Sequence, residues 1–139
     1  MSQIPPAGLV PHLVVQGASD AIEFYKKAFG ATELIRMPAQ DGKRLMHAEL
    51  SIGPSTLYLC DDFPEFCGGK SRAPKSLGGT PVTIHQYVQS CDEAMAKAAA
   101  AGATVTMPAQ DMFWGDRYGQ VTDPFGHHWS FATPLAGKR

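Results

Sequence analysis

The sequence has little net charge and no long hydrophobic run. Its 139 residues carry a formal net charge of -1, and 18% of them are charged. No apolar segment approaches the ~20 residues of a membrane-spanning helix, and the N-terminal letters MSQIPPAG lack the charged-then-apolar layout of a secretion signal. This composition gives no indication of a nucleic acid or membrane partner and predicts a cytoplasmic chain.

Cysteine is also scarce. The chain contains Cys60, Cys67 and Cys91, an odd number without any Cys-x-x-Cys spacing. Such a set favours neither a disulfide framework nor a sulfur-rich zinc site. We therefore expect buried or inert thiols in a single domain that spans residues 1–139.

Two segments of the chain are nearly the same, GATELIRMPAQDGKR and GATVTMPAQDMFWGDR. His12 and His85 are separated by the same number of positions as Arg44 and Arg117. The spacing slips inside the second segment and is restored by the inserted residues Met112–Trp114. A register that holds across most of the chain indicates an internal repeat.

Each copy contains the same order of expected elements. In residues 8–62 the strand PHLVVQ precedes an amphipathic helix, SDAIEFYKKAFG, and three strands follow, ATELIRM, KRLMHAELSIG and STLYLCDD. Residues 80–133 repeat this order, with a helix over SCDEAMAKAAAAG. We expect Ser19 or Asp20 to cap the first helix and Ser90 or Asp92 the second.

The predicted fold class is therefore α+β, with two tandem βαβββ modules whose curved sheets enclose a shared cleft. Residues 63–79, rich in Gly, Pro and Lys, are a linker or mobile loop between the modules. Because curled sheets leave edges that one chain covers poorly, we also expect a homodimer. The sequence does not decide whether the modules pair within or across chains.

The segments AIEFYKKAFGA and YGQVTDPFGHHWSFAT resemble the vicinal-oxygen-chelate superfamily, which groups glyoxalase I, bleomycin-resistance proteins and extradiol dioxygenases. The resemblance extends from about Leu9 to Thr133. Within the superfamily, FWGDRYGQVTDPFG is most similar to the small glyoxalase-like subgroup found beside phosphonate-utilisation genes. The resemblance implies the paired-module fold, but a fold does not determine a reaction.

The resemblance also implies a place for a metal. Metal enzymes of the superfamily hold a divalent ion with side chains of the first and last strand of each module, and the ion binds two adjacent substrate oxygens. Ser130 and Tyr58 occupy the last-strand positions, and neither is a usual ligand. His12, His85 and His128 are expected on the cleft faces of their strands, because strand side chains alternate. They are the predicted ligands of a displaced site for zinc, iron, nickel or manganese, or else hydrogen-bonded residues without a metal.

Several other residues have a functional and a structural interpretation. Glu49 is a candidate catalytic general base or an additional metal ligand, or it belongs to a solvated strand face. Arg44 and Arg117 meet an anionic group, or they pair with Asp41 and Asp116 respectively.

The insertion is expected to form a lid, because it lies at a strand end, where loops over a cleft usually occur. Phe113 and Trp114 would supply its aromatic rim. Trp129, on the last strand, should face the helix side. The predicted substrate-contacting residues are Tyr58, Phe113, Trp114, Arg117, Tyr118 and Ser130.

Two functional classes remain open. The first is a metal-dependent lyase, isomerase or dioxygenase that acts on a small substrate with adjacent oxygens. The second is a metal-free protein that binds or sequesters an aromatic or antibiotic-like molecule without changing it. An assembly module without a ligand is a third interpretation.

Overall fold

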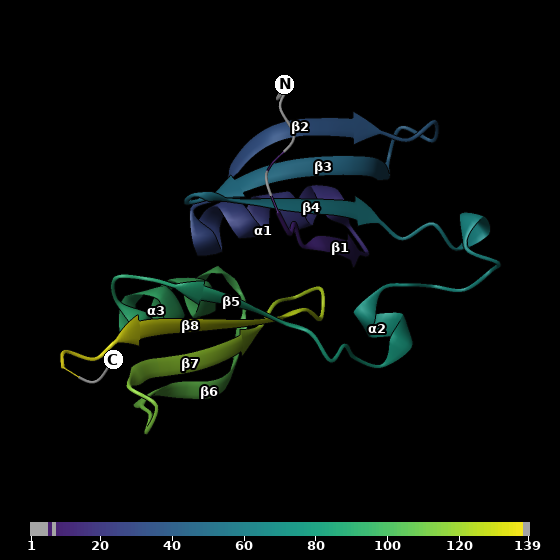
Figure 1. Cartoon of the computed structure of the whole chain (residues 1–139). Helices are drawn as coiled ribbons and strands as arrows, with labels where there is room; N and C mark the ends of the chain where they lie inside the picture. The colour runs from purple at the N-terminus through teal and green to yellow at the C-terminus, as the bar shows by residue number, and fades with distance from the viewer. Residues whose placement is uncertain (1–5, 7, 138–139) are drawn as a thin grey trace.

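The structure is a computed structural model that describes residue 6 and residues 8–137, so the other residues of the predicted 1–139 domain lie outside the described part. Two four-stranded sheets form its framework, with the strand orders β1-β4-β3-β2 and β5-β8-β7-β6 (Figure 1). The pairs β1–β4 and β5–β8 are parallel, and the other neighbours are antiparallel. The α+β class and the tandem βαβββ modules predicted from the repeat are thus confirmed.

The elements follow the predicted order in both modules. The first module comprises β1 (His12–Val15), α1 (Ala18–Phe29), β2 (Thr32–Pro38), β3 (Leu45–Ile52) and β4 (Ser55–Asp61). The second comprises β5 (Thr83–Tyr87), α3 (Cys91–Ala101), β6 (Thr104–Asp111), β7 (Asp116–Thr122) and β8 (His128–Pro134). Between them lie the short helices η1 (Pro64–Phe66) and α2 (Pro74–Leu77).

The strand register confirms that His12 and His85 occupy equivalent positions. His12 on β1 lies opposite Tyr58 on β4, and His85 on β5 lies opposite Ser130 on β8. Each histidine therefore has a residue of its module's last strand as its neighbour across a parallel ladder.

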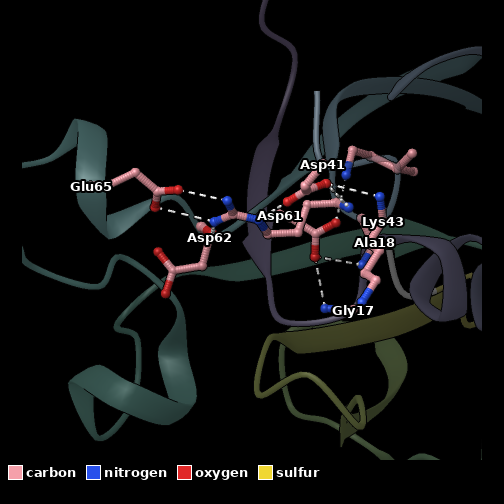
Figure 2. A network of polar contacts seen from close by, with 9 residues as sticks. Gly17, Ala18, Asp41, Lys43, Asp61, Asp62 and Glu65 are labelled. Atoms are coloured by element: carbon pink, nitrogen blue, oxygen red, sulfur yellow. Dashed lines mark hydrogen bonds and ion pairs between the residues drawn. The ribbon is translucent and has the colours of Figure 1, made fainter. Parts of the chain in front are cut away.

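The start of α1 is held by a carboxylate from a distant strand. Gly17, with a left-handed φ of 105°, precedes the helix and has no side chain to cap it. Asp61, at the end of β4, accepts hydrogen bonds at 2.9 Å from the backbone N–H groups of Gly17 and Ala18 (Figure 2). It also accepts one from the N–H of Leu45 at 2.7 Å. The predicted caps, Ser19 or Asp20, are wrong, because Asp61 satisfies the free N–H groups first.

The start of α3 follows its local sequence instead. Ser90 precedes the helix and accepts a hydrogen bond from the N–H of Glu93 at 3.2 Å, which confirms one of the two predicted caps. Among the described residues, no helix is both long and apolar enough to cross a membrane.

Helices α1 and α3 lie between the two sheets and pack against each other (Figure 1). The apolar face of α1 presents Tyr25 and Phe29 to β8, where the ring centroid of Trp129 lies 5.4 and 4.3 Å away, respectively. Trp129 is buried on the helix side of its sheet, as predicted. The two modules of one chain therefore share a single hydrophobic core.

The opposite face of each sheet carries the candidate functional residues. Because the helix-covered faces contribute to the common core, the helix-free faces point away from it on separate sides of the chain. A cleft that both helix-free faces line would thus have to include a second chain.

Candidate functional site

A cavity of about 340 Å³ opens on the helix-free face of the second sheet. Strands β5, β7 and β8 supply most of its wall, and the insertion before β7 supplies the rest. The residues that line it are Thr83, His85, Tyr87, Trp114, Asp116, Tyr118 and Ser130.

His85 connects the base of the cavity to its aromatic wall. Its Nδ1 lies 2.7 Å from the hydroxyl oxygen of the buried Ser130. The imidazole stacks on the ring of Tyr118, with centroids 5.8 Å apart, and meets Tyr87 edge-on at 4.9 Å. Four residues from three strands thus form one polar and aromatic surface.

Trp114, from the inserted segment, lies next to this surface and lines the same cavity. Its indole Nε1 donates a hydrogen bond to Oδ2 of Asp116 at 3.1 Å, and its ring meets Tyr118 edge-on at 5.5 Å. Asp116 is 2% exposed, whereas Trp114 is 41% exposed. The buried carboxylate therefore fixes a tryptophan whose ring remains available at the cavity.

Phe113, the other predicted rim residue, does not line the cavity. Its side chain is 97% exposed and meets Trp114 only edge-on, with ring centroids 5.2 Å apart. The insertion thus contributes one aromatic wall residue to the cavity rather than two.

A second group of candidate residues lies on the helix-free face of the first sheet. The rings of His12, His47 and Tyr58 meet edge-on at centroid distances of 4.8 to 5.9 Å. His47 Nε2 lies 3.0 Å from Oε2 of Glu49, which is the neighbour of Tyr58 across the β3–β4 ladder. Burial, reinforced by the nearby charges of His47 and Arg72, lowers the pKa of His12 and extends its neutral form to lower pH.

Arg44 and Arg117 are both held by carboxylates. Arg44 pairs with Asp41 at 2.8 Å, as predicted, and also with Glu65 at 2.6 Å (Figure 2). Arg117 pairs with Asp92 and Asp111 instead of the predicted Asp116, at 3.1 and 3.0 Å. Asp116 is committed to Trp114, because its buried carboxylate lies on the cavity side of the same strand.

A second cavity, of about 380 Å³, lies at the start of α1. Asp61 and Arg44 are among the residues that line it, and both are already engaged by the helix N–H groups and by carboxylates (Figure 2). The hydrogen bonds and ion pairs of these charged groups thus stabilise the fold. The cavity of the second sheet is therefore the better candidate for a ligand site.

The predicted site residues fall into separate places. Trp114, Tyr118 and Ser130 line the cavity together with His85, whereas Tyr58 and Glu49 lie with His12 on the first sheet. His128 lies beside Thr122, with Nδ1 2.9 Å from the hydroxyl oxygen. The candidate site residues of one chain thus lie on two different sheets.

The prediction missed Thr83, Tyr87 and Asp116 as cavity residues. The signal for the first two was present, since Thr83, His85 and Tyr87 alternate along one strand and must share a face. No sequence pattern marked Asp116 as a cavity residue, because an ion pair with the adjacent Arg117 already explained it.

Comparison with known proteins identifies the family. The family model described as Glyoxalase/Bleomycin resistance protein/Dioxygenase superfamily matches residues 9–131. The chain belongs to this superfamily. Curated relatives of this chain include the uncharacterized protein Mb0911c of Mycobacterium bovis, which is 57% identical over 132 residues. The aligned region covers 95% of this chain and 86% of the relative.

Two solved structures have the same fold as this superfamily member. TioX from Micromonospora sp. ML1 is 29% identical, with a TM-score of 0.70, over 94% of this chain and 100% of that one. The Arabidopsis thaliana gene product At5g48480 is 31% identical, with a TM-score of 0.71, over 92% of this chain and 99% of that one. These likenesses extend over nearly the whole chain and thus include both modules.

The metal chemistry of the superfamily does not fit the residues of one chain. Ser130, at the expected last-strand ligand position, is a hydroxyl already hydrogen-bonded to His85. His12 and His128 lie in other environments, beside Tyr58 and Thr122. Within the described part of the chain, no three His, Cys, Asp or Glu side chains are grouped so that they could hold a metal ion. In the described part of the chain, the three predicted histidines thus do not form one group of ligands.

Proposed function

We propose that this superfamily member binds a small planar or aromatic molecule in the cavity of its second sheet. The observation that carries the proposal is the inserted Trp114, which the buried Asp116 orients beside Tyr118. The first copy of the repeat has no counterpart of this insertion. A feature added to one module, and fixed by a buried carboxylate at a cavity, is best explained by a ligand.

The cavity walls suit such a molecule physically. Tyr87, Trp114 and Tyr118 supply aromatic surface, and the pair His85–Ser130 supplies polar groups that can orient a ligand. Aromatic pairs contribute about 0.5–1.5 kcal/mol beyond the burial of their area. Several such contacts are enough for weak to moderate affinity without any chemical step.

Replacement of Trp114 by alanine should weaken ligand binding by about 1–3 kcal/mol, because it removes one aromatic wall of the cavity. Aromatic and dicarbonyl compounds that bind the parent protein, measured by isothermal titration calorimetry, provide the test. Phe113→Ala is the matched control, since Phe113 is adjacent and aromatic but does not line the cavity. If Trp114→Ala binds every compound as tightly as Phe113→Ala, the insertion has only a structural role.

We further propose that a second copy of the chain completes the binding cleft. The helix-free face of the first sheet carries His12, His47 and Tyr58, and that of the second sheet carries the cavity. Because these faces point apart in one chain, a homodimer would bring the first sheet of one copy over the second sheet of the other.

Light scattering of the purified protein at micromolar concentration should therefore give twice the mass of one chain. Phe113→Glu leaves the proposed wall residues in place and serves as a solubility control for non-specific association. A monomer mass across the whole concentration range would contradict the two-chain cleft, but not the cavity itself.

Catalysis is a second candidate function, favoured by the contact between His47 and Glu49 next to His12 and Tyr58. In a two-chain cleft Glu49 would act as a general base towards a small substrate with adjacent oxygens. Elemental analysis of untagged protein, repeated on His12→Ala and His85→Ala, tests whether a divalent metal takes part. The segment FWGDRYGQVTDPFG supports placing the chain in the glyoxalase-like subgroup associated with phosphonate-utilisation genes.

A further inference from the structure

We propose that His47, on the helix-free face of the first sheet, is a general base that removes a proton from carbon in a small carbonyl compound, with Glu49 as the residue that positions it. This inference rests on the candidate catalytic function and moves the proton-accepting atom from Glu49 to its neighbour. It follows from the contact of an imidazole with a carboxylate inside a cluster of rings.

The contact between His47 and Glu49 fixes where the imidazole can take a proton. Nε2 lies 3.0 Å from Oε2 of the carboxylate, and the two side chains are 23% and 18% exposed. A carboxylate that accepts a hydrogen bond from Nε2–H leaves the lone pair of the neutral ring on Nδ1. General bases act best when they are protonated near the working pH, which favours an imidazole over a carboxylate. Nδ1 is therefore the accepting atom.

Neighbouring strands hold the ring of His47 in place. The rings of His12 on β1 and Tyr58 on β4 meet it edge-on, with centroids 5.8 and 4.8 Å away. Its neighbour across the β2–β3 ladder is the apolar Met37. Burial, together with the charges of His47 and Arg72, lowers the pKa of His12, so this second ring is neutral at neutral pH and can donate one N–H. The base thus lies beside two hydrogen-bond donors.

The second sheet has a neutral pair at the corresponding positions. When positions are counted across the ladders from the two equivalent first-strand histidines, Gln120 corresponds to Glu49 and Tyr118 to His47. The side-chain N–H of Gln120 donates a hydrogen bond to the Tyr118 hydroxyl at 2.8 Å. An amide and a phenol hydroxyl do not act as bases at neutral pH. The repeat therefore keeps a polar pair on both faces, but only the pair on the first sheet can exchange a proton.

The proposed step needs no oxidant or reductant. Nδ1 of His47 takes the proton from the carbon next to the carbonyl group. The C–H electron pair forms a double bond to the carbonyl carbon, and the C=O pair moves onto the oxygen, which accepts a hydrogen bond from the Tyr58 hydroxyl or the His12 N–H. The imidazolium exchanges its proton with water and returns a proton to the same carbon, so the net result is exchange of that hydrogen with solvent.

A planar probe that reports proton removal from carbon is 5-nitrobenzisoxazole. A base takes the proton of its ring C–H while the N–O bond breaks, and the product is a coloured cyanonitrophenolate. We expect the full chain to convert the probe with saturation, at a rate that increases from about pH 5 to 8 as an imidazole loses its proton. His47→Ala should lower kcat/KM about 100-fold and abolish this pH profile, and added imidazole should restore activity.

Two further variants separate the chemistry from folding. Glu49→Gln keeps an acceptor for Nε2–H but removes the charge that stabilises the imidazolium, so kcat should fall about tenfold with KM unchanged. His128→Gln is the matched control and should leave kcat/KM unchanged, because His128 is also a half-buried histidine with a side-chain partner, Thr122. If His47→Ala does not fold, His47→Gln takes its place.

Binding of the probe is followed separately through the indole signal of Trp114, which lines the cavity. If the probe shifts this signal but the parent reacts no faster than His47→Ala, the base assignment is wrong and the binding function remains. If the probe neither shifts the signal nor reacts faster with the parent, both proposals fail. Turnover that requires His47 without a shift of the Trp114 signal supports the base and contradicts the cavity.

Discussion

Replacement of Asp123 by alanine is expected to lower the free energy of unfolding by about 3–5 kcal/mol, the largest effect of any substitution considered for this chain. Asp123 is 4% exposed and accepts four hydrogen bonds. Its Oδ2 receives the Tyr25 hydroxyl at 2.6 Å and the Trp129 indole N–H at 2.9 Å. Its Oδ1 receives the N–H groups of Phe125 and His127 at 2.8 and 3.0 Å. Alanine would leave all four donors without this acceptor.

The effect should extend to both modules, because Tyr25 belongs to α1 and Trp129 to β8. Burial, reinforced by the Asp123 carboxylate, raises the pKa of Tyr25 well above its usual value, so the hydroxyl remains a donor at neutral pH. Tyr25→Phe removes one of the four donors and should lower stability by only about 1–3 kcal/mol. Urea unfolding measures both variants, and equal losses would show that Asp123 does not act as a shared acceptor.

Asp61→Ala should lower the free energy of unfolding by about 3 kcal/mol, because three backbone N–H groups lose their acceptor. Two of them begin α1, and the third begins β3, so one carboxylate fixes a helix and a strand (Figure 2). The substitution should therefore also loosen the first sheet, seen as faster amide hydrogen exchange at Ala18 and Leu45.

Asp20→Ala is the matched control for Asp61→Ala. Asp20 lies in the first turn of the same helix but is exposed, so its loss should change stability by less than about 1 kcal/mol. A loss at Asp20 as large as the loss at Asp61 would mean that helix-end charge, rather than the three hydrogen bonds, stabilises the start of α1.

The repeat in the sequence was sufficient to predict the architecture. Both modules have the expected order of elements, since hydrophobic alternation and helix-ending glycines are local features. The capping of α1 was mispredicted for the opposite reason. Asp61 lies far along the chain from Gly17, and no local pattern indicates that β4 ends beside the helix start.

The candidate site could be predicted only in part. The mismatch between the two copies pointed to Trp114, and strand alternation placed Ser130 and His85 on one face. The hydrogen bond between Trp114 and Asp116 depends on how the hairpin folds. From the sequence alone, the adjacent Arg117 was the expected partner of Asp116, but Arg117 pairs with Asp111. The packing of α1 on α3 turns the helix-free faces of the two sheets away from each other, and the sequence of one module does not specify that packing.

The most direct test of the binding site uses the two tryptophans of the chain. Each gives one indole N–H signal in a ¹H–¹⁵N correlation spectrum, and only Trp114 lines the cavity, whereas Trp129 is 1% exposed in the core. Titration with an aromatic compound that binds the protein should shift the Trp114 signal in proportion to occupancy and leave the Trp129 signal in place. A bound compound that shifts only Trp129, or neither signal, would contradict the proposal that the second-sheet cavity is the ligand site.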